Sequence, residues 1–192
     1  PEPVIEKMLE FYHQYRANIE RGVHRLSQKA SEEYELARRK VASFINAAHS
    51  DEVIMTKNTS EGINIIGSGL NWQPGDQMVT TALEHHSNFI VWLRVARKFG
   101  IDVRVVKPNT QGILDLNDFE KAINNKTKLV ALTHVSNVLG VITPVREVAE
   151  IVHRYNGLVL IDGAQSVPHM EVDVQSLNSD FLAFSGHKMC AP

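Results

Sequence analysis

The chain alternates short apolar runs with longer amphipathic stretches. The apolar runs are rich in β-branched residues and short, as is typical of strands buried on both faces of a sheet. They lie at residues 52–56, 77–82, 103–106, 128–133, 158–161 and 181–184. Between them, helical patterns fall at residues 60–67, 88–99, 116–123 and 144–155. This alternation predicts an α/β fold with a mainly parallel sheet and flanking helices.

The first fifty residues follow a different pattern. Apolar residues recur there at helical spacing in two stripes, one with Val4, Met8, Phe11, Tyr12 and Tyr15 and one with Tyr34, Val41, Phe44 and Ile45. We therefore expect a helical segment over residues 1–50 and an α/β domain over residues 51–192. The stripes predict that these helices pack on the sheet or on a partner subunit.

Composition narrows the function. The chain has 192 residues, 43% of them hydrophobic and 22% charged, with a net charge of −2. Such a charge gives no electrostatic reason to expect nucleic acid or a membrane as partner, so small-molecule chemistry is favoured. The one cysteine, Cys190, cannot form an internal disulfide, and no apolar run is long enough for a membrane span or a secretory signal. These features predict a cytoplasmic protein. The chain does not begin with Met, which is consistent with a removed N-terminus.

The residues with chemical potential follow the predicted strands, where ligands of open α/β sheets bind. In the first such loop, Thr59 and Ser60 open a predicted helix. The free N–H groups and the dipole of a helix start favour a phosphate, and the two hydroxyls could complete its cradle. A simple N-cap explains the same residues.

The next loop contains adjacent histidines, His85 and His86. One of them could stack on a flat aromatic cofactor, or both could be an ordinary surface or core pair. A metal site is not expected, because no thiolate and no histidine pair at helical i, i+4 spacing accompanies them.

Two further loops carry polar side chains. Asn137 could donate a hydrogen bond to a cofactor oxygen or cap its own turn. Asp162 ends a buried apolar strand and is followed by Gln165. A buried carboxylate needs a partner, and a protonated pyridine nitrogen, Mg²⁺ or a structural hydrogen bond would each serve.

Lys188 follows the last predicted strand, 26 residues after Asp162, with Ser185 and His187 beside it as candidate phosphate donors. A lysine for a Schiff base and a carboxylate for the pyridine nitrogen are what a pyridoxal 5'-phosphate (PLP) site requires. An exposed lysine in a glycine-containing turn is the alternative. The combination of loops, rather than any one of them, predicts a PLP site.

Several segments resemble, in order, the class V aminotransferase-fold PLP enzymes. They are residues 21–27 (RGVHRLS), 59–64 (TSEGIN), 84–88 (EHHSN), 133–140 (THVSNVLG), 159–166 (VLIDGAQS) and 184–192 (FSGHKMCAP). The resemblance is to the cysteine desulfurase and selenocysteine lyase branch of the sulfur-mobilisation (SUF) type. It implies PLP-dependent transferase fold type I, with a large mainly parallel sheet, and a homodimer.

The resemblance also implies roles for single residues. Lys188 would carry the cofactor and move the Cα proton of the substrate, while Asp162 would pair with the pyridine nitrogen. Gln165 would face the phenolic oxygen with Asn137 nearby. His85 would stack on the ring, and it is with Lys188 a catalytic candidate. The phosphate would be held by Ser60, Ser185 and His187, beside Thr59.

By the same resemblance, the chain is a truncated large domain. It would lack an N-terminal strand, the C-terminal small domain, a substrate-binding arginine and the cysteine that accepts sulfur; Cys190 does not match that nucleophile. The implied reaction converts L-cysteine into L-alanine and an enzyme-bound persulfide for iron–sulfur cluster assembly, with a sulfur-acceptor protein as a further partner. This chain is expected to be inactive alone. A selenocysteine lyase, another class V enzyme or a catalytically silent binding or dimerisation module are the alternatives, and an open sheet edge predicts self-association.

Overall fold

The computed structural model describes residues 1–191. Pro192, the last residue of the predicted cofactor domain and of the last motif, lies outside the described residues. The chain divides into two compact units. One consists of residues 1–55 with the segment that begins at Gly186, and the other of Thr56–Ser185. The boundary expected between residues 50 and 51 stays a prediction.

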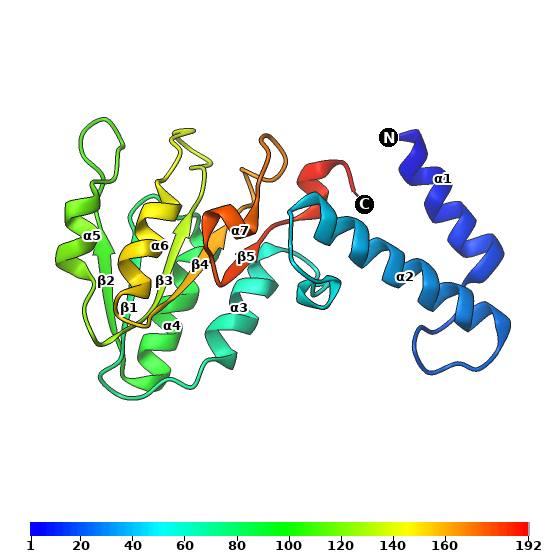
Figure 1. Cartoon of the computed structure of the whole chain (residues 1–192), viewed down its shortest axis with the longest axis horizontal. Coiled ribbons are helices and arrows are strands. Elements are labelled where there is room, and N and C mark those ends of the chain that lie inside the picture. The colour runs from blue at the N-terminus through cyan, green and yellow to red at the C-terminus, as the bar shows by residue number, and fades with distance from the viewer. Residues whose placement is uncertain (192) are drawn as a thin grey trace. The chain divides into compact units, whose positions relative to one another are not determined.

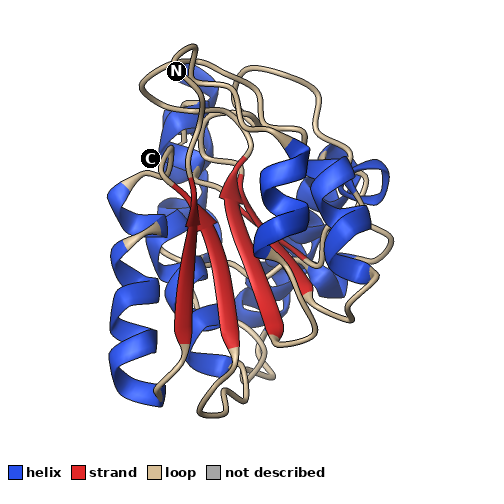
Figure 2. Ribbon diagram, turned by 90° about the vertical axis from the view of Figure 1, so that its left-hand side faces the viewer, coloured by secondary structure: helices blue, strands red, loops and turns tan. Residues whose placement is uncertain are grey.

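The larger unit is built on a five-stranded parallel sheet in the order β2-β1-β3-β4-β5. The strands are β1 (Gln77–Thr81), β2 (Asp102–Val106), β3 (Thr127–Thr133), β4 (Leu158–Asp162) and β5 (Phe181–Ala183). Figures 1 and 2 show the strands side by side, with helices on both faces. The predicted α/β fold with a parallel sheet and flanking helices is confirmed, and these five strands coincide with predicted ones.

Five α-helices accompany this sheet. They are α3 (Thr59–Gly69), α4 (Ile90–Phe99), α5 (Leu116–Ala122), α6 (Val145–His153) and α7 (Val174–Leu177). The first four were predicted from their spacing, with ends that differ by a few residues. The four-residue α7 was not predicted, because it is too short to show a helical period. A 3-10 helix, η3 (His86–Asn88), precedes α4.

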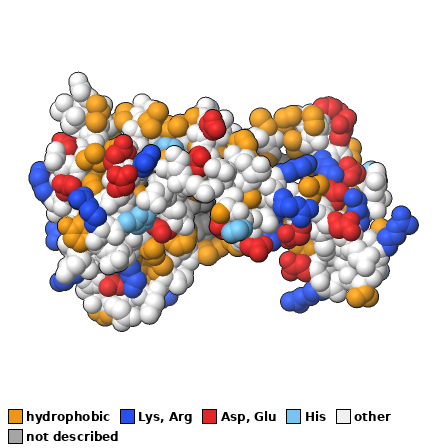
Figure 3. All heavy atoms as spheres, in the orientation of Figure 1, with side chains coloured by type: hydrophobic (Ala, Val, Ile, Leu, Met, Phe, Trp, Pro, Cys, Tyr) orange, Lys and Arg blue, Asp and Glu red, His pale blue; other side chains and the backbone are white. Residues whose placement is uncertain are grey.

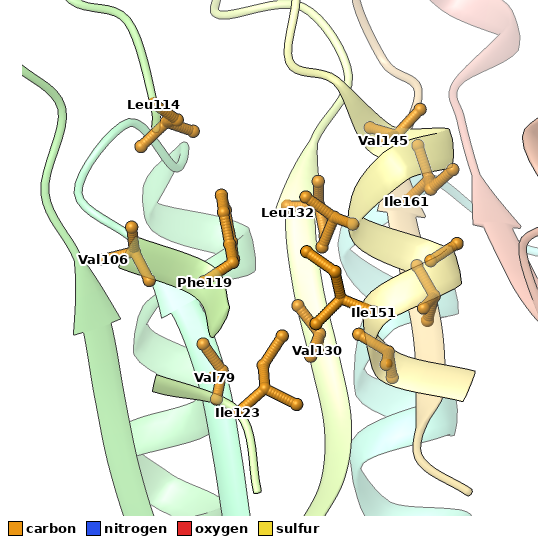
Figure 4. Packing of buried hydrophobic residues seen from close by; sticks show 14 residues of the cluster. Val79, Val106, Leu114, Phe119, Ile123, Val130, Leu132, Val145, Ile151 and Ile161 are labelled. Carbon is orange, nitrogen blue, oxygen red and sulfur yellow. The ribbon is translucent and has the colours of Figure 1, made fainter. Parts of the chain in front are cut away.

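Alternation along the strands divides the core into two layers. One face of the sheet packs on α5 and α6, through residues such as Val130, Phe119 and Val148. Figure 4 shows this layer, with Phe119 of α5 and Val145 and Ile151 of α6 in one cluster with Val79, Val130 and Ile161 of the strands. The opposite face packs on α3 and α4 through Ile63 and Trp92, both fully buried. A sheet covered on both faces explains why its strands appear as continuous apolar runs in the sequence.

The smaller unit is helical, as expected. It contains α1 (Glu2–Glu10), a π-helical turn η1 (Phe11–Tyr15), α2 (Arg25–Phe44), and the 3-10 helices η2 (Ser50–Glu52) and η4 (Gly186–Met189). At the start of α2, His24 accepts a hydrogen bond at Nδ1 from the Ser27 amide, 3.3 Å away. Many apolar side chains of the smaller unit are exposed, including Tyr12 and Phe44 from the two predicted stripes.

The strand expected at residues 52–56 is wrong. Its first residue belongs to η2, and the chain becomes extended only from Val53. The Val53 carbonyl accepts a hydrogen bond from Arg38 Nε at 3.0 Å instead of a bond from a neighbouring strand, and Ile54 is 70% exposed. The segment has strand-like residues, but a strand also needs a ladder partner, and none lies beside it among residues 1–191.

The distribution of charged side chains on the surface in Figure 3 is mixed, as the net charge of −2 would suggest. On the face in Figure 3, basic and acidic side chains are interspersed over each unit. Within the described chain, no helix combines the length and the hydrophobicity needed to cross a bilayer.

Candidate cofactor site

The predicted site residues of the larger unit lie where its strands end. Because all five strands are parallel, their carboxyl ends meet at one edge of the sheet. The loops after β1, β3 and β4 begin there, and α3 starts beside the end of β5. Gly62 in the first turn of α3 lies close to β5, since a Cβ built on it would be 3.6 Å from Ala183 Cβ.

The start of α3 is capped by Asn58 rather than by Thr59 or Ser60. Asn58 Oδ1 accepts a hydrogen bond from the Glu61 amide at 2.9 Å, and the Glu61 carboxylate accepts one from the Lys57 amide at 2.5 Å. This pair of bonds satisfies the helix start in the manner of a capping box. The N-cap interpretation of Thr59 and Ser60 is therefore wrong, and the Ser60 hydroxyl at the N-terminus of α3 is not used for capping.

Thr59 and Ser185 bind each other. Both are buried, and the Ser185 hydroxyl lies 2.9 Å from the Thr59 amide nitrogen, which donates to it, and 2.6 Å from the Thr59 hydroxyl. These bonds join the end of β5 to the start of α3. The family resemblance implied phosphate-binding roles for this loop and for Ser185, and the structure brings Thr59 and Ser185 together although 126 positions separate them.

Asp162 is the last residue of β4 and is 3% exposed. Its side chain continues the row of Leu158 and Leu160, which faces the α3 and α4 layer, because alternate residues of a strand share a face. One carboxylate oxygen accepts a hydrogen bond from the Ala164 amide at 3.0 Å. A buried carboxyl group and a helix N-terminus thus occupy the same face of the sheet, at the same edge.

His85 caps η3 and is exposed. The Ser87 amide donates to His85 Nδ1 over 3.2 Å, and the Ser87 hydroxyl lies 2.7 Å from the same atom. Because a backbone amide can only donate, Nδ1 is an acceptor and Nε2 carries the proton of the neutral ring. The His86 ring lies 6.3 Å away with its plane turned by 82°. The two histidine rings therefore lie nearly at right angles to each other, and only one of them can lie flat against a given ligand.

Glu84 was not identified from the sequence as a candidate site residue. Its carboxyl group accepts hydrogen bonds from the Thr81 hydroxyl, the Thr133 amide and the Asn88 side-chain amide. Burial raises the pKa of this carboxyl group to about 8; the three hydrogen bonds oppose the rise, and the charge of Asp162 adds to it. The available signal was the spacing of Thr81, Glu84 and Asn88, which places three polar side chains around one turn after a strand.

Asn137 and Gln165 lie in the loops after β3 and β4. The turn that contains Asn137 is capped by Ser136, whose hydroxyl accepts from the amides of Val138 and Leu139 at 3.3 and 3.2 Å. Asn137 therefore does not cap its turn, and it is exposed. Gln165 is half-buried, and its backbone carbonyl is 2.6 Å from His169 Nδ1.

Lys188 and His187 belong to the smaller unit, on the 3-10 helix η4, and both are exposed. The other seven predicted site residues lie in the larger unit. The next residue along the chain from Ser185 is the first of the segment that carries Lys188.

Within residues 1–191, no three His, Cys, Asp or Glu side chains gather as a metal site. A surface hollow of about 510 Å³ lies between β2 and α5, and none of the predicted site residues lines it.

The predicted site residues of the larger unit fit PLP. A buried carboxylate suits a protonated pyridine nitrogen, and hydroxyl groups at a helix N-terminus suit a phosphate.

Comparisons with known proteins agree with this chemistry. The aminotransferase class-V family model matches residues 1–192. A protein of Pyrococcus abyssi named "Probable cysteine desulfurase" is 53% identical over 98% of the chain, and the cysteine desulfurase of Haloferax volcanii is 43% identical over all of it. The apo structure of the cysteine desulfurase from Thermococcus onnurineus NA1 superposes with a TM-score of 0.91 at 48% identity, covering 98% of this chain and 47% of that one.

The chain belongs to the aminotransferase class-V family, whose members use pyridoxal phosphate. Within it, the proteins that the chain resembles are cysteine desulfurases. The chain covers 47% of the Pyrococcus protein and 46% of the Haloferax protein, so it spans about half the length of the curated relatives that it matches.

Proposed function

We propose that this chain provides the PLP-binding part of a cysteine desulfurase. One observation carries the proposal: buried Asp162 and the N-terminus of α3 lie on one face of the sheet, at the edge where its strands end. These are the two partners that the opposite ends of the cofactor need. The similarity to cysteine desulfurases supports L-cysteine as the substrate, since 53% identity extends over nearly the whole chain.

In this proposal, each candidate residue has a separate role toward the cofactor or the substrate. When bound, PLP supplies an electron sink that stabilises negative charge at the substrate Cα. Asp162 would pair with the pyridine nitrogen and keep it protonated, while His85 would cover the ring. Gln165 would face the phenolic oxygen, with Asn137 nearby. Thr59, Ser60, Ser185 and His187 hold the phosphate. The Lys188 amine would hold the cofactor covalently; once the amine of the substrate has taken its place on the cofactor, the freed Lys188 amine would remove and return the Cα proton.

The remaining assignments are proposals of the same kind. L-alanine and a protein-bound persulfide are the products, with a sulfur-acceptor protein as the next partner. We also propose a homodimer, which the exposed apolar side chains of the smaller unit, such as Tyr12 and Phe44, would favour. A cytoplasmic location rests on the use of a single cysteine.

Exchange at the substrate Cα tests this function. The chain is loaded with PLP, freed of excess cofactor and incubated with L-cysteine in D₂O, and deuterium at Cα is followed by mass spectrometry. Lys188 is expected to exchange this proton at least about tenfold faster than the same concentration of free PLP, because positioned proton transfer contributes about 10²–10⁴-fold. The variant K188A should show only the background rate. Equal rates for K188A and the unchanged chain would contradict the proposal.

A further inference from the structure

The Glu84 carboxyl group links three elements at the edge of the sheet that carries the site. Its Oε1 accepts hydrogen bonds from the Thr81 hydroxyl at the end of β1, at 2.6 Å, and from the Thr133 amide at the end of β3, at 3.0 Å. Its Oε2 accepts from Asn88 Nδ2 in η3, at 2.6 Å. The Glu84 side chain thus connects the loop after β1 to the end of β3 and to η3.

The direction of these bonds is fixed by their surroundings. The Trp92 indole N–H, which can only donate, points to Asn88 Oδ1 at 3.2 Å. Asn88 must therefore present its NH₂ group to Glu84. The other fixed partner, the Thr133 amide, is also an obligate donor. Asn88 and Trp92 are both fully buried. Each oxygen of the Glu84 carboxyl group therefore faces an N–H group that can only donate: Asn88 Nδ2 at Oε2 and the Thr133 amide at Oε1.

His85 lies inside this closed loop. Glu84 precedes it, Asn88 follows it by three positions, and the Asn88 amide donates to the His85 carbonyl at 2.8 Å. The ring is held by Ser87, which lies between the two ends that Glu84 joins. The exposed imidazole therefore belongs to a loop of five residues, 84–88, whose two ends are hydrogen-bonded to each other and, through Glu84, to Thr133 at the end of β3.

We propose that Glu84 is a positioning residue, which fastens the loop of residues 84–88 through Asn88 and Thr133 and so fixes the orientation of the His85 ring. The inference rests on the proposed function, because the orientation matters for a ring that covers PLP. Glu84 itself touches neither the cofactor nor the substrate in this account. It acts through His85.

The test reverses one hydrogen bond. In E84Q, the new amide has one NH₂ group, which meets an obligate donor whichever way it turns, Asn88 on one side or Thr133 on the other. In N88D, two carboxyl groups face each other. In E84Q/N88D, the NH₂ group introduced at position 84 donates to the carboxylate introduced at position 88, which still accepts from Trp92. The double variant restores every bond at nearly unchanged volume and charge, and it forms a cycle with the single variants.

Two readouts follow the His85 ring. The first is the ¹⁵N spectrum of the imidazole groups at pH 9, above the pKa of Glu84, with the His85 signal assigned by the variant H85Q. In the unchanged chain we expect Nδ1 to be unprotonated. In E84Q and N88D the two tautomers should average, and in E84Q/N88D the original signal should return. The second readout is the dissociation constant of PLP, which should rise about tenfold in each single variant and return to within about twofold in the double variant.

Two outcomes would overturn the inference: a His85 signal and a PLP affinity unchanged in E84Q, or a folded double variant that restores neither. The double variant decides the matter even where a single variant does not fold. The variant I151V, which removes one methyl group from the core behind α6, controls for loss of stability alone and should leave His85 unchanged. The tautomer readout needs no cofactor, so failure of the chain to bind PLP would count against the proposed function and not against the role of Glu84.

Discussion

Replacement of Asp162 by asparagine is expected to weaken PLP binding by about a hundredfold. The Asp162 carboxylate is buried at the end of β4, and its charge is the partner that a protonated pyridine nitrogen requires. Asparagine retains the shape and can still accept from the Ala164 amide, but the charge is lost. Loss of one partner of a buried charged pair costs about 2–5 kcal/mol, and about 3 kcal/mol corresponds to a hundredfold change in affinity.

This prediction is checked by titration of the chain with PLP, followed by absorbance, with urea unfolding of D162N to show that it remains folded. The matched control is D102N, which removes an exposed aspartate at the start of β2. D102N should bind PLP as the unchanged chain does. If D162N and D102N bind with equal affinity, Asp162 does not face the cofactor.

The stability of the chain is expected to fall as the pH rises from about 5 to 9, and E84Q is expected to remove much of that fall. The pKa of the Glu84 carboxyl group is about 8 in the folded chain, against the ordinary value of 4.5. Between these values the folded state holds a proton that the unfolded state has released. Unfolding therefore releases a proton, so a higher pH favours unfolding. The loss begins above about pH 4.5, is complete above about pH 8 and amounts to at most about 5 kcal/mol.

Urea unfolding at intervals of one pH unit measures this loss for the unchanged chain and for E84Q. The donor conflict in E84Q lowers its stability at every pH, so the informative quantity is the slope and not the level. The difference in unfolding free energy between the two proteins should shrink steadily from pH 5 to 8. Parallel curves over this range would show that the Glu84 carboxyl group ionises as it does in an unfolded chain.

The sheet was predictable because burial on both faces leaves a strong signal. Strands such as β4 consist mainly of continuous apolar runs, here residues 158–161, and α4 and α6 each repeat their apolar positions at helical spacing. The strand expected at residues 52–56 was wrong because side-chain pattern reports strand propensity and not the presence of a neighbour. Val53 has the residue type of a strand, but its carbonyl bonds to Arg38.

The site was predictable as a set of loops but not as a set of bonds. Strand ends identified Asp162 and the residues around Thr59, because parallel strands place their carboxyl ends together. The pairing of Thr59 with Ser185 depends on β5 lying beside α3, which no local pattern encodes. Glu84 escaped notice for a similar reason. Its partner Thr133 is 49 positions away, and a glutamate beside two histidines draws attention to the histidines.

The most direct test of the account is to load the chain with PLP, reduce it with borohydride and locate the reduced cofactor by mass spectrometry. The reduction converts a lysine-bound cofactor into a stable amine, so each site of attachment is preserved for mapping. The account predicts one reduced PLP group per chain, attached to Lys188, and none in K188A. No adduct, or adducts scattered over other lysines of the chain, would contradict the claim that this sequence builds a cofactor site.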